Sequence, residues 1–229
     1  MPSRGRANYM LTFIDDFFRK FWAFFLKQKS DVFSAFKSWK TMIEKKTGKQ
    51  IKYLRTDNSL EFYSDEFNKL CKSECIVRHL TVCHTPQQNG IAERMNRMIM
   101  EKVRCMLSNA NLPKSFWAKA TSTARFLINR YPSVSIEKKT PQEVWLGNPA
   151  DYSDLKIFGC LAYAHVDNKK LEPRSIKYVF HSYKASVKGY KLWCPENRKV
   201  VISRDDVFDE TTMLPNLSLK DSSNKENQK

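Results

Sequence analysis

The sequence has no apolar run that approaches the about 20 residues of a membrane-spanning helix. Its first ten residues, MPSRGRANYM, also lack the apolar stretch of a secretory signal peptide. These two absences argue against a membrane protein and against a secreted one. With 229 residues and 41 % hydrophobic content, the chain can still bury a sizeable core. We therefore expect a soluble intracellular protein with no membrane partner.

Closely paired cysteines are absent as well. The six cysteines are scattered and lack the regular spacing of a disulfide framework: Cys71, Cys75, Cys83, Cys105, Cys160 and Cys194. The first three, together with His84, have the spacing C-x3-C-x7-C-H, which matches no common zinc arrangement. We predict reduced structural thiols rather than disulfides or structural zinc.

Acidic residues are few relative to basic ones. The chain has 40 Lys and Arg against 24 Asp and Glu, which gives a net charge of +16. Between residues 156 and 204 the imbalance is 11 to 3. Such a local concentration favours a polyanionic partner, because neutralising phosphates gives affinity without sequence specificity. A protein that is basic without any such partner is the alternative.

The hydrophobic pattern divides the chain into two parts. Up to about Gly147, alternating strand and helix patterns predict an α/β domain. After Asp154, short aromatic and β-branched runs with turn residues between them predict a small all-β module, a barrel or sandwich. The expected strands of the first part are 9–16, 20–27, 51–57 and 76–82, and its helices begin at Ser30, Ser64, Ile91, Phe116 and Thr140.

Two acids are placed where they can act together. Glu93 lies in the first turn of a predicted helix, and Asp57 ends a predicted strand, with 35 residues between them. An isolated glutamate at a helix start is usually explained by the helix dipole. Acids at strand ends and helix starts of an α/β domain can, however, converge on one sheet edge and bind Mg²⁺. Paired divalent ions catalyse phosphoryl displacement, so a basic protein with such a site points to a nucleic-acid phosphodiester.

Several motifs around these acids resemble one family. LRTDNSLEF (54–62) and TPQQNGIAERMNR (85–97) resemble the integrase core of copia-type long-terminal-repeat retrotransposons, as part of the Pol polyprotein. YMLTFIDDFFRKFWAFFLK (9–27) is similar to a strand pair of that core, and NRYPSVSIEKKTPQEVWLG (129–147) to its C-terminal helices. The resemblance implies an α/β RNase H-like integrase core, a mixed sheet flanked by helices.

The rest of the chain resembles the SH3-like module that follows the core in these polyproteins. The motifs are FGCLAY (158–163) and VKGYKLWCPENRKVVISRDDVFDE (187–210). The expected organisation is a leftover N-terminal segment, the integrase core, the all-β module and a disordered tail, at residues 1–8, 9–148, 155–210 and 211–229.

The resemblance also implies an activity and the residues that carry it. Such integrases use an Asp, Asp, Glu triad with Mg²⁺ or Mn²⁺ to process DNA 3′ ends and to transfer strands. By position, Asp57 matches the second acid and Glu93 the third, both as metal ligands. Gln88 and Asn89 match a mobile loop that approaches DNA. Arg94 and Arg97, one and four residues beyond Glu93, are further candidates for contacts with DNA phosphates.

The family also implies partners and a location. The expected partners are element-end DNA and target DNA, and the resemblance is compatible with a homo-multimer. The expected location is the nucleus or a virus-like particle.

The match departs from the family at several places. The first aspartate of the triad lies in the family on a central strand with the pattern H-x-D-x-x-G-P, whereas only MPSRGRAN precedes Tyr9 here, without an acid. We therefore expect a chain that is truncated at its N-terminus and lacks the central first strand. Ser59 and Leu60 replace the glycines of TDNGGEF, and YVFHSY (178–183) replaces a run resembling C-x-F-L-G-Y.

Three functions remain in competition. The first is an integrase fragment that is catalytically inactive because the first aspartate is absent. The second is a non-catalytic nucleic-acid-binding module retained from a retroelement. The third, a nuclease for RNA–DNA hybrids, is disfavoured by the integrase-like spacing and by the SH3-like module.

Overall fold

The computed structural model describes most of the chain, namely residues 1–57, 59–80, 90–165, 175–184, 189–204 and 206–213. The α/β part contains β1 (Tyr9–Ile14), β2 (Phe21–Leu26), α1 (Val32–Thr47), β3 (Tyr53–Thr56), α2 (Asp65–Ser73), β4 (Val77–Leu80), α3 (Gly90–Asn109), α4 (Trp117–Ile128) and α5 (Pro141–Leu146). The all-β part contains β5 (Cys160–His165), β6 (Ser175–Tyr183), β7 (Tyr190–Trp193), β8 (Val200–Ser203) and β9 (Asp206–Met213). The predicted order of α/β elements followed by strands is confirmed.

Side-chain hydrogen bonds cap two of the helices, α2 and α5, at their first turn. Ser64 accepts a hydrogen bond from the backbone N–H of Phe67 at 3.3 Å, as expected of a helix cap. Thr140 and Glu143 form the predicted reciprocal capping box. The prediction for Ser30 was wrong, because it lies inside a short 3-10 turn, Lys29–Asp31. Gln28 and Asp31 close that turn with their own capping box, so α1 begins after Asp31.

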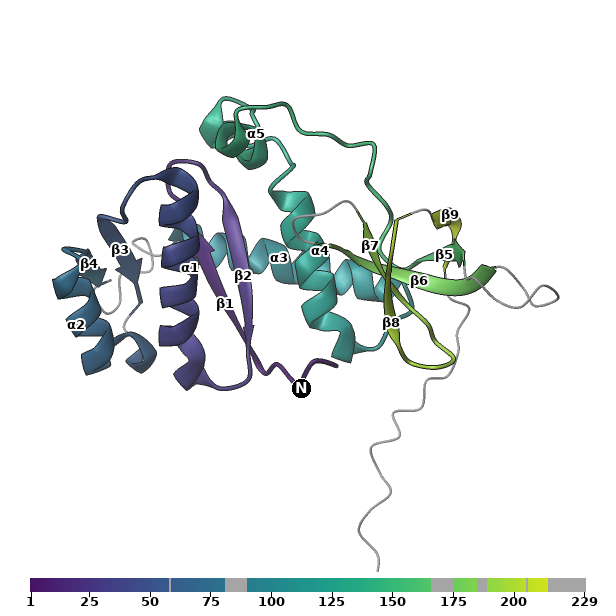
Figure 1. The fold of residues 1–229 in the computed structure, drawn as a ribbon, viewed down its shortest axis with the longest axis horizontal. Coiled ribbons are helices and arrows are strands. Elements are labelled where there is room, and N and C mark those ends of the chain that lie inside the picture. The colour runs from purple at the N-terminus through teal and green to yellow at the C-terminus, as the bar shows by residue number, and fades with distance from the viewer. Residues whose placement is uncertain (58, 81–89, 166–174, 185–188, 205, 214–229) are drawn as a thin grey trace, which may run out of the picture.

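The hairpin of β1 and β2 forms the middle layer of the α/β part. Alternate side chains point to opposite faces, as strand geometry requires. Phe13 and Trp22 pack against α1, where Phe13 stacks on Trp39 with ring centroids 4.3 Å apart. On the other face, Phe21 joins the core formed by α3 and α4. Figure 1 shows α1 on one side of the hairpin and α3 crossing behind it.

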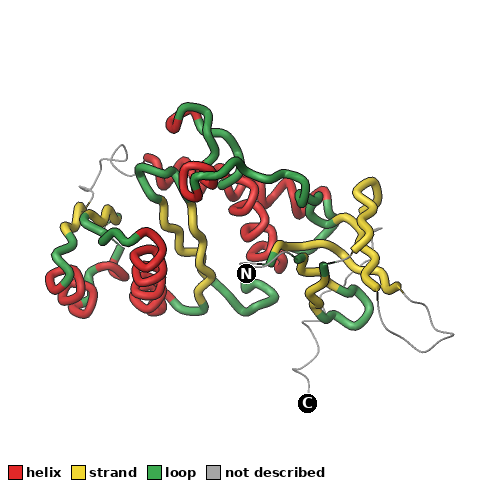
Figure 2. Tube along the Cα trace, turned by 45° about the horizontal axis from the view of Figure 1, so that its top comes forward, coloured by secondary structure: helices red, strands yellow, loops and turns green. Residues whose placement is uncertain are grey.

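The α/β part has two separate strand pairs instead of one continuous sheet. β1 pairs with β2 in antiparallel fashion, and β3 pairs with β4 in parallel fashion. Among the described residues, no strand hydrogen-bonds β1 to β3. Figure 2 shows the two pairs apart, with α1 packed beside them. Side chains of both pairs meet under α1, so the α1 core, and not the sheet, joins the two pairs.

The all-β part is one antiparallel sheet that packs directly on the α/β part. Its strand order is β8-β7-β6-β5-β9, and β9 extends to Met213. Leu161, Val179 and Trp193 of this sheet lie in the same hydrophobic core as α3, α4 and Phe21. The hydroxyl of Thr123 on α4 donates a hydrogen bond of 2.9 Å to the carbonyl of His181. The two parts therefore share a core across α4.

Two further contacts fix this joint. Gly159 has a φ of +88°, and a Cβ at this position would collide with the Cβ of Ala110 at the end of α3. The N-terminal residues, expected as a leftover segment, lie across the joint. The Arg4 guanidinium is 4.9 Å from the ring centroids of both Phe116 and Trp193. Residues 1–8 thus contact both parts of the molecule.

The described helices do not have the length and composition of a membrane span. Within the described ranges, every helix is too short or too polar to cross a bilayer.

A buried histidine makes the stability of the joint depend on pH. His181 is 1 % exposed, and neither ring nitrogen has a hydrogen-bond partner among the described residues. Burial, followed by the charge of Lys119, lowers the pKa of His181 to about 3. The unfolded chain binds a proton below its ordinary pKa of about 6.5, whereas the folded chain does not. Stability must therefore fall as the pH drops from about 6.5 toward 3.

We expect His181→Leu to remove this dependence. The wild-type chain should lose about 2 kcal/mol more stability than the variant between pH 7.5 and pH 5. Urea unfolding of both proteins at the two pH values measures the difference, and carboxylate titrations cancel in the comparison. Parallel losses in the two proteins would show that His181 is not the responsible group.

Candidate functional site

Asp57 directly follows β3 and lies on the open face of the β3–β4 pair. On that face Tyr53 is 66 % and its strand neighbour Val77 is 49 % exposed, whereas Leu54 and Thr56 are buried on the opposite face. Asp57 follows Tyr53 at the two-residue spacing of a strand face and is itself exposed. Its carboxylate is therefore accessible from solvent.

The neighbouring serine occupies one oxygen of this carboxylate. Ser59 donates to Oδ1 of Asp57 twice, from its hydroxyl at 2.6 Å and from its backbone N–H at 3.3 Å. This is the position at which the family pattern has glycine. A hydrogen-bonded hydroxyl competes with any cation for the same oxygen, so Ser59 weakens Asp57 as a metal ligand.

A lysine that the sequence did not single out lies beside this loop. Lys29 forms an ion pair of 2.7 Å with Glu61, and its hydrogen bond lowers the pKa of that carboxyl. Glu61 follows Asp57 in the same motif, and the charge of Asp57 also helps to raise the pKa of Lys29. Lys29 lies in another element of the chain, so motif spacing gives no signal for this contact.

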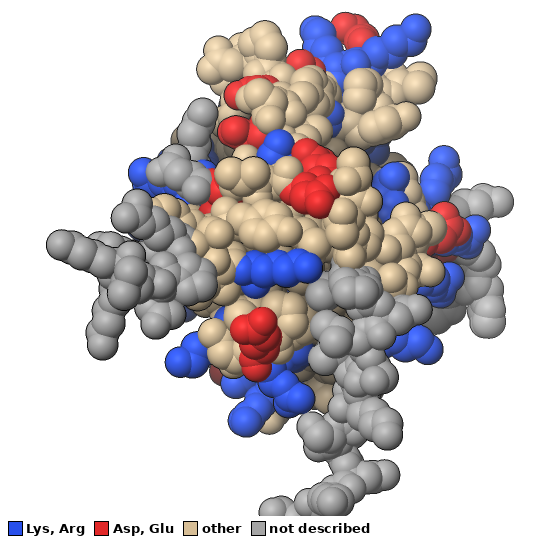
Figure 3. All heavy atoms as spheres, turned by 90° about the vertical axis from the view of Figure 1, so that its right-hand side faces the viewer, with Lys and Arg blue, Asp and Glu red and all other residues tan. Residues whose placement is uncertain are grey.

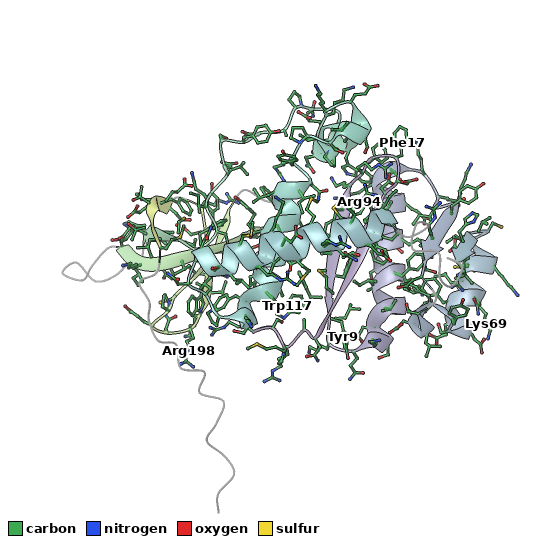
Figure 4. The ribbon with its side chains drawn as sticks, turned by 180° about the vertical axis from the view of Figure 1, so that it is seen from behind. Tyr9, Phe17, Lys69, Arg94, Trp117 and Arg198 are labelled. Carbon is green, nitrogen blue, oxygen red and sulfur yellow. The ribbon has the colours of Figure 1, made fainter. Side chains whose placement is uncertain are left out.

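Glu93, Arg94 and Arg97 lie on the solvent side of α3. All three are exposed, whereas Ile99 and Val103 on the same helix are buried against the core. None of the three has an ion-pair or hydrogen-bond partner among the described residues. Figure 4 shows Arg94 toward the N-terminal end of α3, on the side nearer β3 and β4.

The described side chains do not form a metal centre. Within the described ranges, no group of three or more His, Cys, Asp or Glu side chains lies close enough to hold a metal ion. Asp57 and Glu93 supply two exposed carboxylates, of which one already accepts hydrogen bonds from Ser59. Mg²⁺ requires a near-octahedral set of oxygen ligands. No catalytic step through a metal follows from this arrangement.

Several predicted residues lie outside the described part of the chain. These include the loop residues Gln88 and Asn89 and the zinc alternative's Cys83 and His84. The five described cysteines are free thiols: Cys71, Cys75, Cys105, Cys160 and Cys194.

The described part of the basic region, residues 156–204, shares the face in Figure 3 with acidic and uncharged side chains. Lys and Arg side chains alternate there with Asp, Glu and wide uncharged areas. For example, the Nζ of Lys156 forms an ion pair with Oε1 of Glu210 at 3.4 Å. The described cations at this end of the molecule are therefore interspersed with acids, whereas Lys169, Lys170, Arg174 and Lys188 of the same region lie outside the described residues.

Known proteins with similar sequences cover both parts of the chain. A family model of the retroviral polymerase SH3-like domain matches residues 160–222. The retrovirus-related Pol polyprotein from transposon TNT 1-94 of Nicotiana tabacum is 48 % identical over 214 residues, 92 % of this chain. The corresponding polyprotein from transposon RE2 of Arabidopsis thaliana is 33 % identical over 89 % of this chain. This chain belongs to the copia-type family of retrotransposon Pol polyproteins.

The chain spans only a small part of these family members, 16 % and 14 % of their lengths. A solved structure gives the fold independently. A chain of the simian T-cell lymphotropic virus intasome, in complex with PP2A regulatory subunit B56 gamma, matches 88 % of this chain and 72 % of its own length. The TM-score is 0.51 at 17 % identity. The predicted RNase H-like integrase core with a following SH3-like module is confirmed.

Replacing Ser59 by glycine should strengthen cation binding at Asp57. The variant removes the 2.6 Å hydroxyl contact, and a hydrogen bond of this kind contributes about 0.5–1.5 kcal/mol. We expect Mn²⁺ to bind Asp57 roughly two- to tenfold more tightly, measured by paramagnetic broadening of the nearby amide resonances.

Ser153 provides a matched control, because it donates to Asp151 in the same way, at 2.9 Å and 2.7 Å. Ser153→Gly should leave the broadening at Asp57 unchanged. Equal Mn²⁺ affinity in Ser59→Gly and the wild-type chain would contradict competition by Ser59.

Proposed function

We propose that the chain is the integrase segment of a retrotransposon Pol polyprotein and binds DNA through the exposed face of α3. The observation that carries the proposal is the 48 % identity to a Pol polyprotein across 92 % of the chain. In the family, the activity is 3′-end processing and strand transfer on element-end and target DNA. A multimeric state and a location in the nucleus or a virus-like particle belong to the same proposal.

Support for DNA contact comes from the charges on α3. Arg94 and Arg97 are one and four residues beyond Glu93, so they share a helix face with it or lie next to it. Both are exposed and have no partner among the described residues. Arginine binds phosphate through a planar pair of N–H donors, which favours these positions for backbone contacts.

We also propose that this chain binds DNA without joining it. Asp57 and Glu93 match the second and third acids of the family's triad, whereas the described residues provide no third ligand beside them. Ser59 further occupies Asp57. Mg²⁺ or Mn²⁺ at these two carboxylates would be bound too weakly to organise a phosphoryl transfer.

Joining and binding can be measured with one duplex DNA. The purified chain with Mg²⁺ or Mn²⁺ should yield no processed or joined product. DNA affinity, measured by fluorescence anisotropy, should fall steeply with salt because counterions are released from the phosphates. The double variant Arg94→Gln/Arg97→Gln should weaken binding and reduce the log–log salt slope by about 2, since each lost phosphate contact removes about 0.9.

Lys69→Gln/Lys72→Gln is the matched control, because it removes the same charge from two exposed positions three residues apart on another helix, α2. It should change the salt slope less than the first double variant. Joined product that disappears in Glu93→Gln would refute the inactive assignment. Affinity that is independent of salt would refute DNA binding through phosphates.

A further inference from the structure

A cavity of about 640 Å³ lies at the joint between the α/β part and the β-sheet. Its walls come from β2, α4, α5, the ends of α1, β6 and β7 and the residue after β8, together with Lys20 in the turn before β2. We call it the α4 pocket. Six cationic residues line it: Lys20, Lys46, Arg125, Arg130, Lys184 and Arg204. Among the described lining residues, Asp154 alone is acidic, which leaves a formal charge of 6 − 1 = +5.

The described contacts of Arg125 and Lys20 in the α4 pocket include no acidic partner. Arg125 has no ion-pair or hydrogen-bond partner for its guanidinium among the described residues. Lys20 is 8 % exposed, and its ammonium donates to the uncharged Gln142 at 2.8 Å and lies 4.9 Å from the Trp145 ring centroid. Arg130 lies 3.5 Å from the Phe126 ring centroid. Lys20 is thus held by uncharged groups, and one acid, Asp151, acts on the charge of Arg130.

Several of these cations line the same cavity closely enough to repel one another. Burial lowers the pKa of Lys20 to about 8, and the charges of Lys46, Arg130 and Arg125 add to the effect. Burial also lowers the pKa of Arg125. Buried charges are costly unless they are paired, so a bound anion would relieve both desolvation and repulsion.

The volume and hollow form of the cavity limit which kinds of anion it could bind. Its volume falls in the range of small-molecule sites, about 300–1,000 Å³. Duplex DNA carries its phosphates along a convex rod, with one charge per about 1.7 Å of axis, and presents them to a surface rather than into a hollow. One inorganic phosphate would leave most of the +5 charge uncompensated. A compact molecule with several phosphate groups matches both the volume and the charge, and guanidinium groups bind phosphate bidentately.

We propose that the α4 pocket binds a small polyphosphate, a molecule with two or more closely spaced phosphate groups. The ligand would contact α4 through Arg125, the turn after α4 through Arg130, and the β1–β2 turn through Lys20. Lys184 would contact it from the end of β6. Such a ligand would connect the α/β part to the β-sheet. The site is separate from Asp57 and Glu93 and does not depend on DNA joining.

Inorganic tripolyphosphate is the probe, with sulfate at matched ionic strength as the control for screening. Isothermal titration calorimetry on the full chain should give one tripolyphosphate per chain, and thermal unfolding should shift to higher temperature. Sulfate should produce neither result. Arg125→Gln should weaken tripolyphosphate binding by about tenfold or more, the loss expected for a bidentate charge-assisted contact.

Two other variants make the test specific. Lys46→Gln changes an exposed residue at the end of α1, so it should fold normally and still weaken tripolyphosphate binding. Lys69→Gln removes the same charge from α2, at the end of the molecule opposite Arg198 in Figure 4. It should change the affinity less than twofold.

The proposal is overturned if tripolyphosphate shows no saturable binding or if Lys69→Gln weakens it as much as Arg125→Gln. A duplex DNA titration separates the pocket from the DNA surface. Arg125→Gln should leave DNA affinity nearly unchanged. If it weakens DNA as strongly as tripolyphosphate, the pocket is part of the DNA interface and the small-molecule assignment is wrong.

Discussion

Helix α4 is buried on two sides, and the rest of the structure depends on this packing. Small side chains let the helix approach its neighbours closely: Ala120, Thr121, Thr123 and Ala124 are each 0 % exposed. One side of α4 packs against the hairpin and α3, and the other packs against β6. Larger residues at these positions would overfill a core that is already close-packed. The SH3-like sheet is therefore held as part of the same body as the integrase core.

This packing also explains how a divided sheet is tolerated. β1 and β3 do not pair, so neither strand gains stability from a common neighbour. Hydrophobic packing under α1 links them instead, through Phe13 on β1, Trp39 on α1 and Leu54 on β3. On the far edge of the hairpin, the buried amide of Asn129 bonds to both the N–H and the carbonyl of Phe21, at 2.9 Å and 2.8 Å. One strand edge is thus closed by a side chain at the end of α4.

The two candidate catalytic acids are exposed and lie outside the buried packing around α4. Asp57 follows a strand whose outer face is exposed, and Glu93 lies on the solvent side of α3. Their chemistry is limited to that of two accessible carboxylates, one of which is hydrogen-bonded to Ser59. The cations of the α4 pocket, by contrast, are held by packed elements. Binding of anions is better supported by these side chains than phosphoryl transfer.

The features that the sequence could predict are mostly local or repeated. The Thr140–Glu143 capping box was predictable because its partners are three residues apart, and strand and helix periodicity placed both parts of the chain. Ser30 was misassigned because serine caps are common and the competing Gln28–Asp31 box is unusual. The resemblance located Asp57 and Glu93. It could not reveal the α4 pocket, because Lys20 and Arg125 meet only through the tertiary fold.

Calorimetric unfolding of the full chain tests the shared core most directly. If α4 unites the integrase core and the SH3-like sheet, heating should give a single transition with equal calorimetric and van't Hoff enthalpies. Gly159→Ala, which introduces a clash with Ala110 at the joint, should lower the temperature of that whole transition. Two resolved transitions, with only one of them shifted by Gly159→Ala, would contradict the account.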